Sequence, residues 1–451
     1  FRVDPVEVKV ENDSIDIEMR IFEGKQATIN KVMVTGNTKT NDRVVRREIR
    51  TKPGELFSKT DIVRTQRELA QLGFFNPEKM NVLPKPNPTE GTVDIEYVLE
   101  EKPSDQIELS GGYGNGIIIG TLGITFNNFS ARKFFSADAW KKGLPAGDGQ
   151  RLSLRIQSNG SYYQSYNASF VEPWLGGKKP ISLSVSAYYS IFSNSLYSSN
   201  TSSSALYTIG TSVGVGKRLK FPDDFFTLFH EVSYQNYRLN NYNLGIGFTD
   251  GSSNNINITE TLSRNSIDQP IFPRTGSIFS ASVQLTPPFS SISGKDLNDP
   301  DLAPSEKYKF VEYHKWKFSA EWYSKIVGNN RPLVLRAKAR FGFLGSYTNL
   351  ETPFERFFVG GDGLSGGLNF FGRDIVALRG YENFSLTPSQ GSARNFIGGT
   401  VFDKFILELR YPISLNPNAT IYALTFAEAG NAWLKVKQFN PFEAKRSFGA
   451  G

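Results

Sequence analysis

Two sets of residues have types and spacing that could support catalysis or metal binding. The segment Gly363-Leu364-Ser365-Gly366-Gly367 has the Gly-x-Ser-x-Gly spacing of serine hydrolases, in which the catalytic histidine follows later in the chain. Both histidines, His230 and His314, come before this segment. They also cannot by themselves fill a zinc site, which needs about three or four protein ligands, and the chain has no cysteine. We therefore interpret the glycines at 363–367 as part of a loop.

Three further glycines, Gly112, Gly114 and Gly116, raise the question of nucleotide binding. Their spacing differs from that of a dinucleotide-binding loop and is more typical of a hairpin turn. A phosphate-binding Gly-x-x-x-x-Gly-Lys-Ser/Thr pattern does not occur in the sequence. Because cysteine is absent, a disulfide scaffold and a cysteine nucleophile are excluded as well. The sequence thus predicts a protein that is not an enzyme and that uses no cofactor or metal.

The distribution of charge divides the chain near residue 104. Of 51 basic and 44 acidic residues, positions 1–104 hold 17 and 18, which leaves 34 and 26 for the other 347 positions. Such a drop in charge density indicates a domain boundary. The net charge of +7 comes from the second part, but no Lys/Arg cluster there is interleaved with aromatic residues, so we expect no nucleic-acid partner.

The chain opens on Phe1, without an initiator methionine or the pattern of a signal peptide. We therefore expect it to be a mature or trimmed fragment. No run of 18 consecutive apolar residues occurs, which excludes a transmembrane helix but leaves a membrane location open.

A repeated strand pattern organises the first part. Ile15-Asp16-Ile17-Glu18 and Val93-Asp94-Ile95-Glu96 lie 78 residues apart, as expected for tandem modules. We assign residues 1–25 to the end of one module and residues 26–104 to a complete second one. In the second module, the turn, capping and alternation signals predict an α+β order of strand, two helices and two strands. The expected elements are a strand at 31–35, helices from Thr40 or Asn41 to Ile49 and from Ser58 to Gly73, and strands at 80–84 and 92–99.

Residues 105–451 alternate between apolar and polar side chains over long stretches. The stretches 181–187, 313–326 and 333–343 each place apolar residues at one parity and charged or serine residues at the other. Strands of soluble sandwiches usually run about 5 or 6 residues, whereas a tilted membrane-spanning strand needs about 9 to 11. Because a sheet can lie in lipid only when it is closed, long strands with this alternation predict a transmembrane antiparallel β-barrel.

Thirteen such strands can be placed along the sequence. Because single-chain bacterial barrels use even numbers, we expect 16 strands in the full protein, with C-terminal strands missing after Ser447-Phe448-Gly449-Ala450-Gly451. The expected strands are 106–113, 117–127, 150–158, 162–171, 181–191, 205–217, 225–238, 254–265, 276–286, 309–326, 332–344, 400–411 and 419–431.

A segment of about 55 residues, the long loop 346–399, separates two of these strands and has no periodicity of its own. Loops beyond about 15 residues are usually functional or disordered. This one contains Phe358-Val359-Gly360-Gly361, the glycines at 363–367 and Leu378-Arg379-Gly380-Tyr381. Its glycines suit a compact folded loop.

The order of these motifs resembles the BamA-like outer-membrane insertase superfamily. Val32-Met33-Val34-Thr35-Gly36-Asn37 followed by Arg46-Arg47-Glu48-Ile49 is similar to the opening of a POTRA module, the periplasmic repeat of this family. Leu378, Arg379, Gly380 and Tyr381 resemble the family's Val-Arg-Gly-Phe/Tyr motif, which lies in an extracellular loop folded back into the barrel. Phe426-x-Glu428-x-Gly430 resembles its Phe-x-Asp-x-Gly strand, and Glu408 lies where the family has another inward acid. A generic α+β domain remains the alternative for the first module.

The resemblance and the cost of a buried charge together imply a set of contacts. An arginine inside a narrow barrel must be paired or hydrated, so we expect Arg379 to reach Glu428 and also Glu408. Gly380 would allow a close approach, and Tyr381 would pack on Phe426. Glutamate at 428 departs from the family's aspartate and leaves the bidentate geometry open. The alternative is that all three charges are ordinary hydrated groups of the lumen.

The function that the resemblance implies is insertion of β-barrel proteins through a lateral seam between the first and last barrel strands. We nominate Ile107, Leu109, Gly111 and Gly112 in the first strand as the seam, because edge strands are templates for pairing. The implied partners are unfolded outer-membrane β-barrel clients, accessory assembly lipoproteins and outer-membrane lipid. The implied location is the bacterial outer membrane, with POTRA modules in the periplasm.

Two other functions remain open. A two-partner-secretion or related translocation pore shares both modules, and a passive porin or adhesin would share the alternation alone. The stretch 129–149, with Phe134-Phe135, Trp140 and Lys141-Lys142, is longer than a hairpin needs. An interfacial or partner-binding insertion and an ordinary surface loop both fit it.

Overall fold

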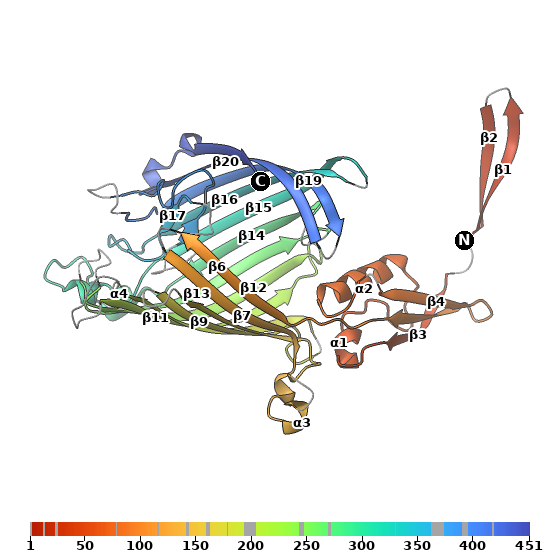
Figure 1. Cartoon of the computed structure of the whole chain (residues 1–451), viewed down its shortest axis with the longest axis horizontal. Helices are drawn as coiled ribbons and strands as arrows, with labels where there is room; N and C mark the ends of the chain where they lie inside the picture. The colour runs from red at the N-terminus through yellow and green to blue at the C-terminus, as the bar shows by residue number, and fades with distance from the viewer. Residues whose placement is uncertain are drawn as a thin grey trace. The chain divides into compact units, whose positions relative to one another are not determined.

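The computed structural model of the chain divides into two compact units (Figure 1). The first unit comprises residues 1–105 and 126–151, and the second comprises residues 106–125 and 152–451. The structure describes residues 2–11, 14–22, 26–77, 79–114, 117–140, 144–158, 163–177, 179–193, 204–242, 248–268, 272–329, 331–361, 374–389, 396–416 and 419–451.

The N-terminal residues form an antiparallel hairpin of β1 (Arg2–Glu11) and β2 (Ser14–Phe22). The strand that corresponds to β2 in the next module is β5 (Thr92–Val98). The two strands begin at Ser14 and Thr92, so the structure keeps the 78-residue repeat of the sequence. The assignment of residues 1–25 to a preceding module stays a prediction.

The next residues fold into the predicted order of strand, two helices and two strands. β5 lies in the middle of a three-stranded sheet, parallel to β3 and antiparallel to β4. Val93, Ile95 and Tyr97 alternate along β5, and all three are buried in the core beneath the helices. The remaining elements are β3 (Thr28–Thr35), α1 (Asp42–Arg46), α2 (Lys59–Gln71) and β4 (Asn81–Asn87).

Both helix starts were predicted from capping residues, but only α2 has a hydrogen bond to the side chain of its N-cap residue. The Ser58 hydroxyl accepts a hydrogen bond from the Asp61 amide at 3.2 Å, as expected at the start of α2. At α1 the prediction was wrong, because the Asn41 side chain makes no cap and instead donates to Asp148. α1 ends at Arg46, three residues before the expected Ile49.

The carboxylate of Glu101 organises the loop before α1. It accepts hydrogen bonds from the amides of Thr38, Lys39 and Thr40 at 3.1, 2.8 and 2.7 Å, and from the Thr38 hydroxyl at 2.7 Å. Partial burial opposes ionisation of Glu101, but the hydrogen bonds from Thr40 and Thr38 and from these amides outweigh it and lower its pKa. The loop is therefore held by the charged form of the carboxylate.

This lowered pKa predicts a loss of order in acid. A group whose pKa is lower in the folded state contributes its full stabilisation above the usual glutamate pKa of about 4.3 and loses it as the pH falls through the folded pKa. We expect amide hydrogen exchange at residues 38–40, corrected for the intrinsic rate, to accelerate as the pH falls through the folded pKa of Glu101. Glu101→Gln should show the faster exchange already at neutral pH. An equal acid response in Glu101→Gln and in the exposed control Glu55→Gln would contradict the assignment.

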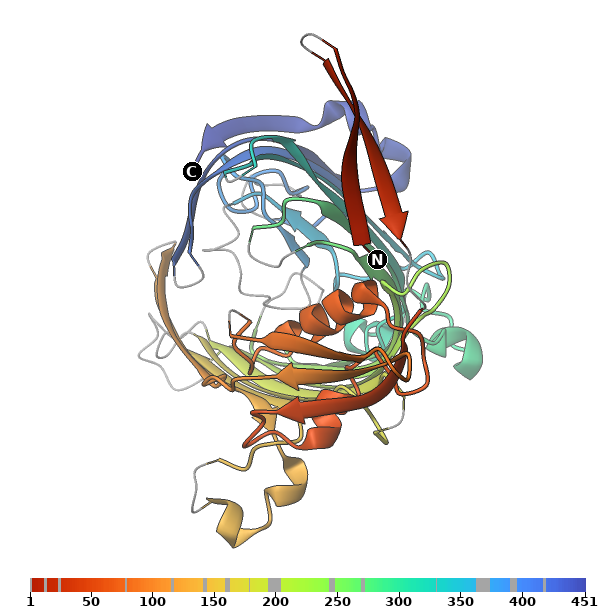
Figure 2. The same ribbon diagram turned by 90° about the vertical axis from the view of Figure 1, so that its right-hand side faces the viewer.

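The second unit is built on one antiparallel sheet of fourteen strands that curves round on itself (Figure 2). Each strand pairs with its neighbours in chain order, so the sheet is a continuous meander from β6 to β21. Its strands are β6 (Gln106–Gly114), β7 (Ile117–Phe129), β8 (Gln150–Ser158), β9 (Tyr163–Glu172), β10 (Ile181–Ser193), β11 (Ala205–Arg218), β12 (Phe226–Asn240), β13 (Gly251–Asn265), β14 (Gly276–Leu285), β15 (His314–Val327), β16 (Leu333–Gly345), β19 (Val401–Asn416), β20 (Ala419–Trp433) and β21 (Lys445–Ala450).

The thirteen expected strands are confirmed, with two corrections. Residues 445–450, which we expected to lie beyond the last strand, form the fourteenth strand and pair with β20. β15 begins at His314 and not at 309, because Val311 and Tyr313 donate their amides to Asn254 and to the Thr286 hydroxyl instead of joining the ladder.

Short elements lie in the connections. Within the long loop, which has no periodicity of its own, β17 (Phe357–Val359) and β18 (Asp374–Val376) form a short parallel pair. The helical turns are η1 (Ala131–Lys133), α3 (Ala137–Trp140), α4 (Phe289–Ser293), α5 (Pro304–Lys307), η3 (Val436–Gln438) and η4 (Pro441–Glu443).

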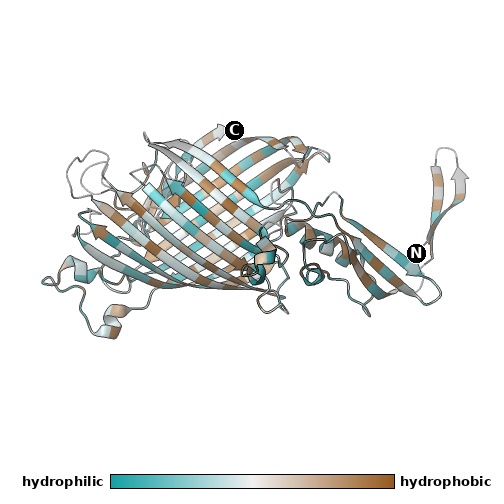
Figure 3. Ribbon diagram, turned by 60° about the horizontal axis from the view of Figure 1, so that its bottom comes forward, coloured by the Kyte–Doolittle hydropathy of each residue, from teal (hydrophilic) through white to brown (hydrophobic). Residues whose placement is uncertain are grey.

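The polarity of the large sheet is inverted relative to a soluble protein. Along β15 the side chains of Phe318 and Trp322 are 45% and 62% exposed, whereas Lys315 and Glu321 are buried. The stripes of alternating hydropathy run across the whole sheet (Figure 3). Apolar residues therefore face outward and charged residues inward, as the alternation predicted. Among the helices of the described residues, none combines the length and apolar character needed to cross a bilayer.

Candidate functional site

The long loop between β16 and β19 is packed against the inner side of the sheet. β17 and Val376 of β18 are buried in a hydrophobic cluster with Leu378, Phe402 of β19 and Tyr237 of β12. Phe354, which precedes β17, stacks on Tyr237 with ring centroids 4.8 Å apart. The loop thus has a core of its own that fixes the backbone on which Arg379 is carried.

Arg379 is held by two carboxylates from neighbouring strands. Its Nε donates to Glu428 Oε1 at 2.7 Å, its backbone amide donates to Glu428 Oε2 at 3.0 Å, and its Nη2 donates to Glu408 Oε1 at 2.6 Å. The guanidinium carbon lies 3.7 Å from the centre of the Phe426 ring. The expected contacts of Arg379 with Glu428 and Glu408 are present, and charge-assisted bonds of this kind are among the stronger hydrogen bonds in proteins.

The register of β19 and β20 explains why these residues meet. Glu408 lies directly opposite Phe426, and Glu428 is two residues further along β20 on the same inward face. Both glutamates are almost completely buried, with 3% and 1% of their side chains exposed. Since buried carboxylates need partners, the position of Arg379 satisfies two acids at once.

The other motif residues shape the approach of the loop. Gly380 has φ +85°, a conformation that favours glycine, and a Cβ there would press on the Ser447 Cβ at 3.1 Å. A Cβ on Gly430 would lie 2.7 Å from the Asp403 carbonyl oxygen and 3.4 Å from Leu378. Both glycines therefore allow the loop and the strands to approach closely.

Tyr381 does not make the contact that we expected. Its hydroxyl donates to the backbone carbonyl of Arg446 in β21 at 2.9 Å. Phe426 packs on the Arg379 guanidinium instead, and among the described residues no ring contact joins Tyr381 and Phe426. The motif thus also connects the loop to the last strand of the sheet.

The sequence reasoning placed Arg336 in the lumen but did not predict the contacts of the cations that complete this cluster. Glu408 Oε2 accepts from Arg336 at 2.9 Å and from Arg410 at 2.6 Å, while Glu428 Oε2 lies 3.1 Å from Lys404 Nζ. We call the six residues joined by these contacts the lumen cluster; its members are Arg336, Arg379, Lys404, Glu408, Arg410 and Glu428. The available signal was parity, because Lys404, Glu408 and Arg410 alternate along one face of β19.

A second attachment of the loop was also missed. The buried Lys315 of β15 contacts Glu355 at 2.9 Å and Asp374 at 3.1 Å, and Lys317 contacts Asp374 at 3.2 Å. Glu355 lies two residues before β17, and Asp374 is the first residue of β18. The loop is therefore attached to β15 as well as to β19 and β20. The alternation of β15 placed both lysines inward but did not identify their partners. The glycines at 363–367 lie outside the described residues.

The strand nominated as a seam is an edge of the large sheet. Within the described residues, β6 pairs with β7 on one side, and β21 pairs with β20, so β6 and β21 are the two outer strands. Ile107 and Leu109 are 77% and 84% exposed, and a Cβ on Gly111 would meet nothing within 4 Å. Gly112 continues β6 opposite Ile119.

A family model for the Omp85 superfamily domain matches residues 146–451. This match covers more than half of the chain. The chain belongs to the Omp85 superfamily. A second family model, for POTRA, described as a surface antigen variable number repeat, matches residues 27–102. The fold of this Omp85 chain is therefore a POTRA domain followed by strands of an outer-membrane β-barrel, as the sequence predicted.

Relatives of known role are similar over nearly the whole chain. Outer membrane protein assembly factor BamA of Neisseria meningitidis is 22% identical over 94% of this chain and 49% of its own length. BamA of Nitratidesulfovibrio vulgaris is 25% identical over 97% of this chain and 48% of its own length. The Omp85 chain thus spans about half the length of the curated relatives that it matches.

Solved structures share the fold. BamA from Haemophilus ducreyi lacking POTRA domains 1–3 superposes with a TM-score of 0.56 at 21% identity, covering all of this chain and 82% of the other. CdiB from Acinetobacter baumannii gives a TM-score of 0.54 at 12% identity, covering 94% of this chain and 67% of the other. These likenesses concern the fold; the family matches and the BamA relatives place the barrel strands in the outer membrane and the POTRA domain in the periplasm.

Proposed function

We propose that this Omp85 chain is part of an assembly factor that folds and inserts β-barrel proteins into the outer membrane. The observation that carries the proposal is the match of the chain to BamA proteins over 94% or more of its length, including their assembly role as named. Unfolded β-barrel clients would be its substrates, and accessory assembly lipoproteins and outer-membrane lipid its partners. No covalent chemistry is required of it, because client insertion exchanges hydrogen bonds and buried surface.

The geometry of β6 supports a route for the client along the sheet edge. An unpaired strand edge offers amide and carbonyl groups at the spacing of another strand, so it templates pairing by β-augmentation. The run Gly111-Gly112 weakens packing at one end of β6 and favours exchange of partners there. The anchored loop supports the same route, since it occupies the inner side of the sheet and leaves the edge as the site of entry.

Site-specific crosslinking tests this route. A photo-crosslinking residue in place of Leu109 should capture a stalled β-barrel client, because the side chain lies on the outward face of the edge strand. The matched control is Val232 of β12, which is also outward and 55% exposed but lies in the interior of the sheet. Client adducts at Val232 with none at Leu109 would contradict the seam.

A translocation pore is the second candidate, because CdiB shares the fold. That likeness concerns the architecture alone. The two functions differ in where the client is found, since a pore would give crosslinks from inward positions such as Arg340 and none from Leu109. A passive porin is less consistent with a loop tied to the inner side of the sheet at two places.

A further inference from the structure

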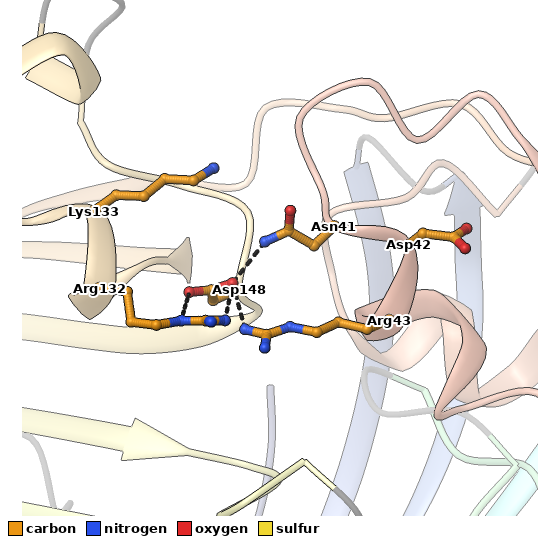
Figure 4. Close-up of a pocket in the computed structure, with 6 residues that line it drawn as sticks. All are labelled: Asn41, Asp42, Arg43, Arg132, Lys133 and Asp148. Carbon is orange, nitrogen blue, oxygen red and sulfur yellow. Dashed lines mark hydrogen bonds and ion pairs between the residues drawn. The ribbon is translucent and has the colours of Figure 1, made fainter. Parts of the chain in front are cut away.

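The connection between β7 and β8 carries an insertion, residues 130–149, built on a buried carboxylate. Asp148 is 2% exposed and accepts hydrogen bonds from Asn41 at 2.6 Å, from Arg43 at 2.7 Å and from the Ser130 hydroxyl at 2.7 Å. Arg132 approaches the same carboxylate at 3.3 Å (Figure 4). This β7–β8 insertion and the POTRA residues around α1 are thus joined in one compact unit.

Backbone contacts fix the base of the insertion as well. The Asn41 amide donates to the Gly147 carbonyl at 2.9 Å, and the Gly147 amide donates to the Asn128 carbonyl at 2.8 Å. Gly147 has φ +118°, and a Cβ there would lie 2.5 Å from the Lys39 carbonyl oxygen, so the chain passes this point only as glycine. These contacts fix the base of the insertion relative to the POTRA residues of the same unit.

The tip of the insertion gathers exposed aromatic side chains. Phe134 lies at the centre, with ring centroids 5.3 Å from Phe135 and 5.4 Å from Trp140. The Trp140 indole donates to the Phe134 carbonyl at 2.7 Å, which orders the turn. Phe135 is nevertheless 92% exposed, and Phe134, Trp140 and Leu144 are 42%, 45% and 40% exposed. Contiguous exposed apolar groups of this kind mark an interaction surface.

The connectivity of the sheet sets where this insertion begins and ends. The chain enters β6 at Gln106, directly opposite Thr125 near the end of β7. Residues 130–149 thus leave and re-enter the sheet at the end where the chain connects to the periplasmic POTRA domain. Because β7 and β8 are membrane strands, the insertion must begin and end at the periplasmic boundary of the bilayer.

We infer that the tip of the β7–β8 insertion inserts into the periplasmic leaflet of the outer membrane and binds phospholipid. Tryptophan and phenylalanine beside basic residues are typical of segments that lie in the membrane interface. Arg132 and Lys133 precede the aromatic residues, and the sequence of residues 130–149 holds four basic residues against two acids, Asp138 and the buried Asp148. This excess complements anionic phospholipid headgroups. The inference rests on the membrane location of the strands and not on the proposed assembly activity.

The absence of cysteine allows a direct test with the whole chain. Phe135→Cys, labelled with an environment-sensitive fluorophore, would be reconstituted in nanodiscs of phosphatidylethanolamine with or without phosphatidylglycerol. The matched control is Val63→Cys on α2, an exposed apolar position of the same unit, 49% exposed. We expect blue-shifted emission, quenching by lipid-borne quenchers, and several-fold weaker quenching by iodide at position 135 than at position 63. Phosphatidylglycerol should strengthen this protection.

Two results would overturn the inference. Equal iodide quenching at both positions in lipid would show that the tip stays in water. Protection that appears only after a purified accessory protein is added, and not in lipid alone, would identify a protein-docking surface instead. Neither result depends on client crosslinking at Leu109, so the membrane inference and the assembly proposal can fail separately.

Discussion

Replacement of Arg379 by alanine is expected to lower the free energy of unfolding by about 3–5 kcal/mol, because it removes one cation from two buried acids at once. Glu428 and Glu408 are 1% and 3% exposed and would each lose a contact shorter than 2.8 Å. Lys404 would still neutralise part of the charge on Glu428, which favours the lower end of the range. The measurement is thermal unfolding in detergent, followed by the loss of heat-modifiable migration.

The matched control is Lys325→Ala, which removes an exposed cation of β15 and should leave the unfolding temperature nearly unchanged. Arg379→Lys separates charge from geometry, because lysine keeps the charge but cannot bond both carboxylates with a planar fork. We expect Arg379→Lys to recover only part of the stability. If Arg379→Ala unfolds like the control and assembles clients normally, the three charges are ordinary hydrated groups.

The loss of Glu408 should have an effect of similar or larger size. Glu408 accepts from Arg336, Arg379 and Arg410 together, so Glu408→Ala would place three cations around an empty position. Removal of one member of a buried ionic network typically costs about 3–5 kcal/mol. We expect a fall in unfolding temperature together with faster proteolysis within the long loop.

Two variants distinguish a network from a local defect. Glu260→Ala removes a carboxylate of β13 that is 40% exposed and paired with His230, and should cost no more than about 1 kcal/mol. In the double variant of Glu408→Ala with Arg379→Ala, the effects should fall well short of additive, because both changes break the same contact. Strict additivity would show that Arg379 and Glu408 act independently.

The alternation of side chains was sufficient to predict most of the large sheet, because a strand buried on one side must keep a period of two. It failed where other forces set the boundaries. β21 is only six residues long and its sequence, Lys-Arg-Ser-Phe-Gly-Ala, has no clear alternation, so pairing with β20 decides its structure. At β15, buried hydrogen bonds of Tyr313 delay the start of the strand.

The site was predictable to a lesser degree. The resemblance brought Arg379, Glu408 and Glu428 together, but parity alone places an inward residue without naming its neighbour. The pairing of Arg336 with Glu408 depends on the register between β16 and β19, in which the two lie directly opposite. The contacts of Lys315 depend on the path of the loop, which no local pattern encodes. Contacts across strands or from a loop therefore required the structure.

The three attachments of the long loop have a mechanical consequence. Phe354 is stacked on β12, Asp374 is bound to β15, and Arg379 is bound to β19 and β20. The loop therefore connects strands that are not neighbours in the large sheet. Any separation of the strands between β12 and β20 would have to break several of these contacts at the same time. We therefore expect the sheet to resist deformation most between β12 and β20 and least toward β6, where the elastic strain from a thinned or curved bilayer would be concentrated.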